Sequence, residues 1–369
     1  MKKVLFLIHD LGQGGAEKVL VNLVNHMDLT RFDVTVMSLF GGGINEQFLK
    51  PEIKYLTVFK KMVPGNTKLM KVFSPSQLHK RFVREKYDIE ISYLEGPSAR
   101  IISGCKDDTT KLVSWIHGEQ HTIKQLSASF RSAKEASDSY GRFDMTVCVS
   151  KCVRDDFGEI LDYKKPCRVL YNTVESEMIV RKSIEKVNIF SDYKVFRIVA
   201  VGTLKAIKGY ERLFEVVKKL TLESYSIHLY VLGIGPEKKK LENYIKENEL
   251  EKVISLLGYD TNPYKYVKNC DLFVCSSYAE GFSTAATEAL IVGTPVCTVE
   301  VSGMKEMLGE NNEYGIVTEN NEEALYQGIK RLLDNPDLLA HYKKQAEIRG
   351  RMFNTENTVK AVEEMLLSL

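Results

Sequence analysis

The sequence predicts an α/β protein built from two consecutive doubly wound, Rossmann-like domains, and three observations support this prediction. Its 369 residues exceed what one hydrophobic core usually organises. Short apolar runs alternate with stretches of helical spacing, as in parallel sheets that helices cover on both faces. The alternation is interrupted once by a polar stretch and then restarts, so two domains of similar size follow each other.

The first domain is expected over residues 1–175. Residues 4–8 are a continuous apolar run, which suits a parallel strand buried on both faces, and residues 16–27 have the spacing of an amphipathic helix. Because the first run is short and charged and glycine-rich sequence follows it, we interpret it as a buried strand and not as a signal peptide. Later apolar runs predict strands at residues 32–39, 89–93, 111–116, 145–149 and 168–171.

Residues 176–195 are polar with weak periodicity and are expected to be a linker. The second domain, residues 196–350, repeats the pattern of the first. Its predicted strands are residues 196–201, 226–232, 253–257, 272–276 and 294–299, and its predicted helices are 210–220, 236–248, 284–292 and 322–334. Ligands of doubly wound domains bind at the carboxyl ends of strands, so a cleft between the two domains is the expected site.

The composition is that of a soluble globular protein. Apolar residues make up 44% and charged residues 27%, which argues against disorder. No apolar run approaches the roughly 18–20 residues that span a bilayer. The net charge of +2 excludes no class of partner. The seven cysteines lack the spacing of a zinc site and are expected to be reduced thiols in the cytosol.

A glycine cluster follows the first predicted strand. Gly14 and Gly15 would let a ligand approach backbone N–H groups at a helix N-terminus, whereas the alternative is an ordinary tight turn. Glu17 stands where a dinucleotide fingerprint has its third glycine, and the second predicted strand does not end in an acid. A nicotinamide or flavin enzyme is therefore disfavoured.

Two further features lie at the predicted carboxyl ends of strands. His117 follows the strand at 111–116, where ligands of α/β sheets bind, although most single histidines are structural. Lys205 and Lys208 lie in the loop between the strand at 196–201 and the next helix. Two cations beside a helix N-terminus favour a phosphate site, and the alternative is a solvated basic loop.

The strongest motif is the stretch from Glu280 to Glu288. Gly281 allows close backbone approach, and Ser283 or Thr284 can cap the helix that follows. One carboxylate can then contact a sugar and the other a ribose, with a diphosphate between them at the helix N-terminus. The alternative is that both glutamates are merely solvated.

Together these segments resemble retaining glycosyltransferase family 4, whose members have the GT-B fold of two Rossmann-like domains facing across a cleft. The resemblance covers nearly the whole chain and implies that the tail, about residues 355–369, returns as a helix to the first, acceptor-binding domain. It rests on Gly14 and Gly15, the loop of Lys208, residues 231–237 and 257–259, Glu280 and Glu288 with seven residues between them, and residues 293–296.

The resemblance also implies roles for individual residues. Lys205 and Lys208 would neutralise the donor diphosphate, Glu288 would bind the ribose, and Glu280 and His117 would contact the sugar. The implied catalytic residues are Glu280, His117 and Lys208. The implied donor-binding residues are Gly14, Gly15, Thr203, Lys205, Lys208, Gly258, Tyr259, Gly281, Phe282, Ser283, Thr284 and Glu288.

One position departs from the family. Thr203 stands where members usually have an arginine, and Lys205 would replace that cation only as a point charge without bidentate geometry. The chain also contains no Asp-x-Asp sequence, so neither a metal clamp nor another cofactor is expected. The charge on the leaving diphosphate would then be balanced by lysine and by a helix dipole.

Residues 50–86 contain ten Lys or Arg and two Glu, a net charge of +8, with apolar and aromatic residues between them. Such a segment suits an anionic membrane face, and the alternative is a solvated surface; no nucleic-acid module accompanies it. We therefore expect a cytoplasmic protein, peripheral on the inner face of the cell membrane.

The predicted function is transfer of a sugar, with retention at its anomeric carbon, from a nucleotide-diphospho-sugar to an acceptor hydroxyl. A UDP-sugar is favoured as donor, and a lipid-linked glycan in surface polysaccharide assembly is the expected acceptor. One alternative is a GT-B protein that binds a nucleotide sugar or glycan without transfer, for which Thr203 is the support. The other is a nucleotide-sugar epimerase or a phosphorylase on the same fold.

Overall fold

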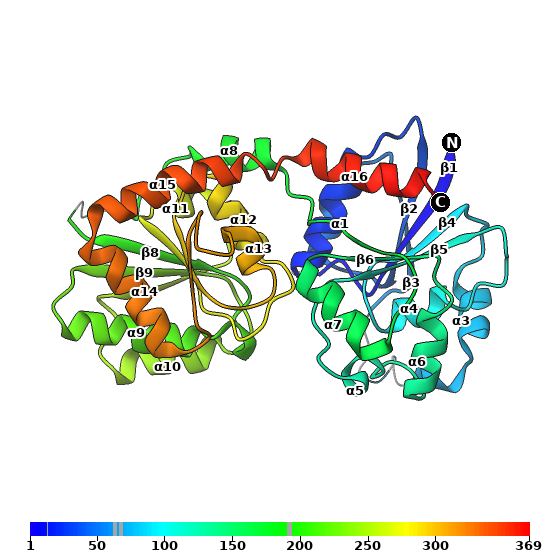
Figure 1. Ribbon diagram of the computed structural model, residues 1–369, viewed down its shortest axis with the longest axis horizontal. Coiled ribbons are helices and arrows are strands. Elements are labelled where there is room, and N and C mark those ends of the chain that lie inside the picture. Colours follow the sequence, from blue (N-terminus) through cyan, green and yellow to red (C-terminus); the bar gives the residue numbers. More distant parts are fainter. Residues whose placement is uncertain (13, 62–64, 66–68, 190–193) are drawn as a thin grey trace. The chain divides into compact units, whose positions relative to one another are not determined.

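The computed structural model describes residues 1–12, 14–61, 65, 69–189 and 194–369, and these form two compact units (Figure 1). Unit 1 consists of Met1–Thr173 together with Thr355–Leu369, and unit 2 is Val174–Asn354. Each unit contains one parallel sheet with helices packed against it, as the sequence predicts.

The sheet of unit 1 has seven strands in the order β3-β2-β1-β4-β5-β6-β7. Between β1 and β4 the strand order reverses, which is where ligands of doubly wound sheets bind. Continuous apolar runs account for the central strands, since residues 4–8 of β1 are all buried. The strands are β1 (Lys2–Ile8), β2 (Phe32–Phe40), β3 (Lys54–Phe59), β4 (Ile89–Ser92), β5 (Lys111–Ile116), β6 (Met145–Cys148) and β7 (Cys167–Val169).

The tail of the chain returns to unit 1 as helix α16 (Thr355–Leu367), which confirms the prediction. The carboxylate of Glu363 in this helix accepts a hydrogen bond from the backbone N–H of Asp28 at 2.6 Å. The other helices of this unit are α1 (Gly15–His26), η1 (Ile44–Phe48), η2 (Met70–Val72), α3 (Pro75–Phe82), α4 (Pro97–Ile102), α5 (Ile123–Leu126), α6 (Ala133–Tyr140) and α7 (Lys151–Leu161).

The sheet of unit 2 has six strands in the order β10-β9-β8-β11-β12-β13, and its order reverses between β8 and β11. The strands are β8 (Phe196–Val201), β9 (Ile227–Leu232), β10 (Ile254–Gly258), β11 (Leu272–Cys275), β12 (Val296–Val299) and β13 (Ile316–Thr318). The helices are α8 (Ser176–Ser183), η3 (Ala206–Lys208), α9 (Tyr210–Leu222), α10 (Lys238–Glu247), α11 (Tyr264–Lys268), α12 (Thr284–Ile291), α13 (Met304–Leu308), α14 (Glu322–Asp334) and α15 (Pro336–Gly350).

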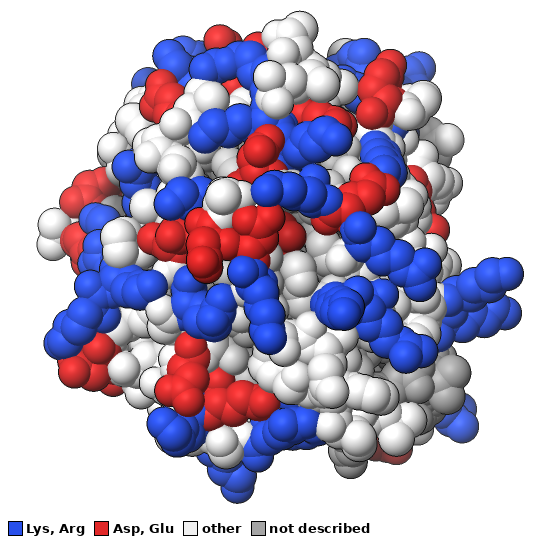
Figure 2. Space-filling model, turned by 90° about the vertical axis from the view of Figure 1, so that its right-hand side faces the viewer, with Lys and Arg blue, Asp and Glu red and all other residues white. Residues whose placement is uncertain are grey.

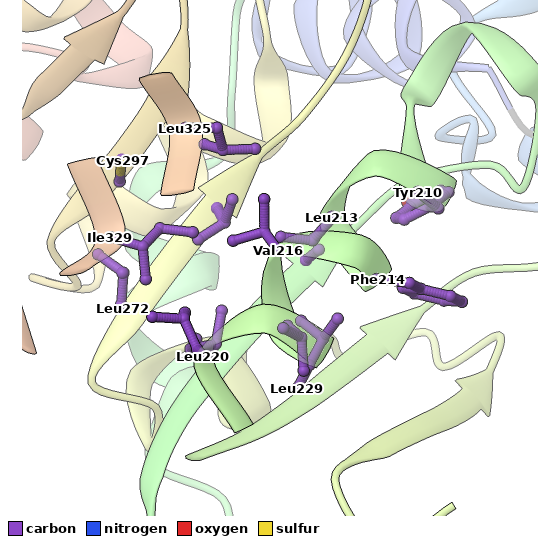
Figure 3. Packing of buried hydrophobic residues seen from close by; sticks show 14 of the residues in the cluster. Tyr210, Leu213, Phe214, Val216, Leu220, Leu229, Leu272, Cys297, Leu325 and Ile329 are labelled. Atoms are coloured by element: carbon purple, nitrogen blue, oxygen red, sulfur yellow. The ribbon is translucent and has the colours of Figure 1, made fainter. Parts of the chain in front are cut away.

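A hydrophobic cluster fixes helix α9 against the sheet of unit 2 (Figure 3). Leu213 and Phe214 of α9 are fully buried in it, and Leu325 and Ile329 reach it from α14. Because Tyr210 at the start of α9 also belongs to the cluster, the loop between β8 and α9 is held in place at its end. That loop carries Lys205 and Lys208.

The structure differs from the expectations in two stretches. The expected linker, residues 176–195, begins with helix α8, because Ile179 packs into unit 2 and gives the polar segment one buried side; residues 190–193 lie outside the described residues. The basic run 50–86 contains the edge strand β3, and its Met62 and Lys68 also lie outside them.

The seven cysteines, all within described parts of the chain, are free thiols. In the described ranges no helix combines the length and apolar character needed to cross a membrane.

Candidate active site

Two loops of unit 2 meet at the carboxyl ends of the neighbouring strands β8 and β11. The N–H of Tyr278 donates to the carbonyl of Ile207 at 2.7 Å, and the Ser276 hydroxyl donates to the carbonyl of Lys208 at 3.0 Å. Gly209 makes this approach possible, because a Cβ there would lie 2.1 Å from the carbonyl oxygen of Ser276. Its φ of +62° also favours glycine.

The contact of these loops brings Lys208 and Glu280 together across 72 residues of sequence. Lys208 Nζ lies 2.6 Å from Glu280 Oε1, and the Ser277 hydroxyl donates to the same oxygen at 2.6 Å. The two side chains are only 26% and 12% exposed. Burial by itself lowers the pKa of Lys208, but the negative charge of Glu280 outweighs it and raises that pKa above its ordinary value. Lys208 is therefore a cation in a partly dehydrated site.

Arg212, which sequence reasoning missed, holds the loop of Ser277 in position. It is 5% exposed and donates from Nε to the carbonyl of Ser276 at 2.7 Å and from a terminal nitrogen to the carbonyl of Ser277 at 2.6 Å. Its guanidinium carbon also lies 4.2 Å from the ring centre of Tyr278. A charged residue on the otherwise apolar face of predicted helix 210–220 was the signal that could have revealed it.

Helix α12 begins beside this charge pair. Ser283 is its N-cap, and the Ser283 hydroxyl accepts from the N–H of Ala286 at 3.3 Å. The other N–H groups of the first turn have no partner within the helix and carry the positive end of its dipole. Gly303 packs against this start, since a Cβ there would lie 3.0 Å from the Gly281 carbonyl oxygen. The site thus combines one lysine with a helix N-terminus, as a diphosphate requires.

The remaining predicted donor residues of unit 2 differ in how exposed they are. Glu288 lies on α12 and is 6% exposed, whereas Lys205 is exposed and Thr203 is half-buried. Gly258 ends β10 with a φ of +77°, and Tyr259 after it is 45% exposed. Phe282 is buried and Thr284 is half-buried at the start of α12.

His117 of unit 1 follows β5, as predicted. Its Nε2 atom is buried and has no hydrogen-bond partner among the described residues, and its ring centre lies 4.8 Å from that of Tyr93. Burial lowers the pKa of His117 to about 3, so the imidazole is neutral. Glu95, another residue that sequence reasoning missed, accepts from the His117 N–H at 3.1 Å and from Gln120 at 3.0 Å. Glu95 therefore orients the loop that carries His117.

Gly14 is the N-cap residue of α1 and Gly15 is its first residue. A Cβ on Gly14 would lie 1.9 Å from a carboxylate oxygen of Glu17, so the absence of a side chain makes room for that carboxylate. An acidic side chain in the first turn is favourable at a helix N-terminus. An anionic ligand at Gly14 would have to displace Glu17.

Metal-ligating side chains come close together at one place within the described ranges, in unit 1. Donor atoms of His79, Glu90 and Cys105 lie within 4.8 Å of one another. His79 Nε2 is 2.7 Å from Glu90 Oε2, so this buried group is accounted for as a hydrogen-bonded ion pair beside a thiol.

Family models match both halves of the chain. The model described as Glycosyltransferase Family 4 matches residues 13–177, and the model described as Glycosyl transferases group 1 matches residues 181–349. The chain belongs to glycosyltransferase family 4.

Relatives of this glycosyltransferase include the Campylobacter jejuni protein named N-acetylgalactosamine-N,N'-diacetylbacillosaminyl-diphospho-undecaprenol 4-alpha-N-acetylgalactosaminyltransferase. It is 29% identical over 362 residues, which cover 96% of each chain. An uncharacterized glycosyltransferase of Haemophilus influenzae is 22% identical over 98% of each chain.

Solved structures confirm the GT-B fold of the glycosyltransferase. HepE of Anabaena, solved in complex with UDP and glucose, superposes with a TM-score of 0.80 at 18% identity, over 100% of both chains. Sucrose-phosphate synthase of Thermosynechococcus elongatus gives a TM-score of 0.82 at 15% identity, over 100% of this chain and 99% of the other.

Proposed function

We propose that this glycosyltransferase moves a sugar from a UDP-sugar to a hydroxyl of a lipid-linked glycan, with retention at the anomeric carbon. The observation that carries the proposal is the Lys208–Glu280 pair, 2.6 Å apart, at the carboxyl ends of β8 and β11 and beside the start of α12. Lys208 and the N–H groups of α12 would bind the diphosphate, and Glu280 would contact the sugar.

The donor and acceptor classes are supported by the relatives. HepE was solved with UDP and glucose, which favours a UDP-sugar as donor. The Campylobacter jejuni relative is named for an acceptor in which a glycan is joined to undecaprenol through a diphosphate. We propose an acceptor of the same class here. Glu288 and His117 remain predictions for the ribose and sugar contacts, and metal independence remains a prediction that an excess of EDTA would test.

We further propose that unit 1 attaches peripherally to the cytoplasmic face of a membrane. Leu69, Val72 and Phe73, in and beside η2, are 66%, 72% and 42% exposed. Figure 2 shows a face of the protein on which Lys and Arg are numerous, with few acidic groups between them on its right-hand part.

Residues 69–73 form an apolar loop, and hydrogen bonds to its backbone carbonyls hold it in place. Arg100 donates to Met70 at 2.9 Å and to Phe73 at 2.7 Å, and Arg131 donates to Lys71 and Val72, each at 2.5 Å. The carbonyl groups of the loop are thus occupied, and its apolar side chains remain exposed. Exposed apolar groups on a basic segment suit an anionic lipid surface.

A binding protein without transferase activity is the competing function, and Thr203 favours it. Without the usual arginine, the diphosphate would depend on Lys208 and the exposed Lys205. The two functions differ in whether UDP is released from a donor. An epimerase would instead convert one UDP-sugar to another without releasing UDP in proportion to product.

The deciding experiment incubates the purified protein with a panel of UDP-, GDP- and ADP-sugars and measures release of the nucleoside diphosphate, with and without lipid-linked glycan from membranes. We expect slow hydrolysis of a UDP-sugar that the acceptor accelerates. The configuration of the new glycosidic bond, read from the anomeric proton coupling, tests retention. Tight UDP-sugar binding without turnover under both conditions would contradict the proposal.

A further inference from the structure

Unit 1 contains a cavity of about 450 Å³ that none of the roles above uses. Residues 56–59 of β3 form one wall, and residues 81, 82, 84 and 85 at and after the end of α3 form the other, with Met37 and Tyr87 also lining it. The volume lies within the range of roughly 300–1,000 Å³ that small-molecule sites occupy.

The cavity lies at the β3 side of the sheet. β3 is an edge strand of the seven-stranded sheet, and four consecutive residues of it touch the cavity. Met37 of the neighbouring strand β2, which pairs with Leu56 in the sheet, also lines the cavity, so the cavity lies between the outer part of the sheet and the end of α3.

The walls of the groove are largely apolar. Leu56, Val58, Phe59 and Phe82 are each half-buried, and the rings of Phe59 and Phe82 meet edge to face at 5.7 Å between centres. Partly exposed apolar side chains gathered in a concave site favour a ligand with an apolar portion.

Two cations without carboxylate partners stand at the same groove. Arg81 and Arg84 are exposed, and among the described residues neither forms an ion pair; Arg84 makes one long contact, 3.5 Å from Nε to the carbonyl of Arg81. Glu85 is the only acid among the described residues that line the groove, and it is already paired, with Lys54 Nζ at 2.6 and 2.7 Å from its two oxygens. The groove therefore carries a net positive charge beside an apolar surface.

We propose that this groove binds the diphosphate and the adjoining apolar units of the lipid-linked acceptor. The inference rests on the acceptor class proposed above and assigns its lipid end to a site. Arg81 and Arg84 bind the phosphate oxygens, for which guanidinium is suited because it donates in a planar fork. The hydrocarbon units lie along Leu56, Val58 and Phe59. A free sugar or a nucleotide would leave these apolar walls unused.

The test measures binding of farnesyl diphosphate to the full chain by titration calorimetry, in the absence of any donor sugar. We expect farnesyl diphosphate to bind saturably. Inorganic diphosphate lacks the hydrocarbon chain and farnesol lacks the diphosphate, so each should bind at least tenfold more weakly. Arg81→Gln/Arg84→Gln is expected to weaken farnesyl diphosphate binding at least tenfold while UDP affinity stays unchanged. Phosphatidylglycerol micelles should compete poorly.

A matched control removes two cations from the opposite edge of the same sheet, where Arg168 belongs to β7 and Lys164 precedes that strand. Lys164→Gln/Arg168→Gln should bind farnesyl diphosphate like the wild type. The proposal is overturned if the Arg81/Arg84 variant binds it equally well, if both double variants lose it equally, or if phosphatidylglycerol micelles compete with it as well as unlabelled farnesyl diphosphate does. Because UDP binding and sugar-nucleotide turnover are measured separately, these outcomes leave the proposed transferase activity intact.

Discussion

At the scale of single residues, Glu280 determines how the site distributes charge. Its carboxylate is bound by Lys208 and Ser277, each at 2.6 Å, so Lys208 is not free to bind a diphosphate until Glu280 releases it or shares it. Lys208 is thus positioned for a diphosphate, and Glu280 neutralises its charge until the diphosphate binds. Replacing Glu280 should therefore change turnover and UDP binding in different ways.

Glu280→Gln is expected to lower turnover of the UDP-sugar by about 10²–10³-fold, because a charged contact that strengthens in the transition state is lost. UDP affinity should stay unchanged or rise, since the neutral amide no longer neutralises Lys208. Turnover by UDP release and affinity by titration with UDP are measured separately. Glu310→Gln, at an exposed position of the same unit, serves as control. Wild-type turnover in Glu280→Gln would disprove the assignment.

His79 gives unit 1 a defined dependence of stability on pH. Burial by itself lowers the pKa of His79, but hydrogen bonds to Cys105 and Glu90 and the charge of Glu90 raise it to about 9, from 6.5 in an unperturbed histidine. The folded state therefore binds a proton more tightly than the unfolded state. The stabilisation is complete below about pH 6.5 and is lost as the pH rises through 9.

We expect the free energy of unfolding of unit 1 to fall by on the order of 2 kcal/mol between pH 6.5 and pH 9. Trp115, the one tryptophan of the chain, is buried in β5, so its fluorescence in denaturant titrations reports on unit 1. His79→Gln should flatten this slope, whereas His341→Gln, at an exposed position in unit 2, should leave it unchanged. An unaltered slope in His79→Gln would contradict the ion pair.

At the scale of elements, local patterns predicted strands with continuous apolar runs and helices with a strong apolar face. They failed where tertiary contacts supply the stabilisation. β3 reads as a basic stretch because, as an edge strand, it leaves Lys54 and Thr57 exposed. Helix α8 reads as linker because its apolar side is narrow, with Ile179 as its buried apolar residue. In both segments the hydrophobic periodicity is too weak to predict the strand or the helix without the elements that pack against it.

Helix α16 is expected to stabilise unit 1 although it is distant from it in sequence. Val359, Val362, Met365 and Leu366 are buried, and Lys2 donates to the carbonyl of Leu366 at 3.1 Å. Deleting residues 355–369 should lower the free energy of unfolding of unit 1 by on the order of 5 kcal/mol, since the burial of four apolar side chains is lost.

Trp115 fluorescence in urea measures that loss, and titration with UDP tests unit 2 in the same protein. UDP affinity is expected to persist, because the described Lys208 site lies wholly in unit 2. Lys360→Ala, an exposed position of α16, should change neither measurement. Equal stability of the deleted and the full chain would show that the packing of α16 contributes little.

At the scale of the whole molecule, the order of the motifs identified the family and the fold. The motifs of His117, Lys208 and Glu280 each follow a strand, and the carboxyl ends of the parallel strands of one sheet lie at the same end of that sheet. The pairing of Lys208 with Glu280 was not predictable, since it depends on β8 and β11 being neighbours despite their distance in sequence. Arg212 and Glu95 were missed for the same reason: each acts on a loop from another element.

The charge of the whole chain is +2, yet residues 50–86 carry +8, so the protein should attach to anionic lipid through one segment. We expect binding to phosphatidylglycerol vesicles at low salt and little binding to phosphatidylcholine. Each cation near the surface contributes about 1 kcal/mol, and salt screens that attraction. Vesicle sedimentation over a salt series is the measurement.

The apolar loop should add to this attraction by entering the lipid interface. Leu69→Ser/Val72→Ser/Phe73→Ser is expected to weaken binding to anionic vesicles at least tenfold, because side chains that were 42–72% exposed in water no longer gain from burial. Leu222→Ser/Ile348→Ser removes two exposed apolar side chains from unit 2 and should bind like the wild type. If the triple variant binds equally well, the loop does not enter the lipid. If anionic and neutral vesicles bind alike at low salt, the basic segment is a solvated surface and the enzyme reaches its acceptor without a membrane contact of its own.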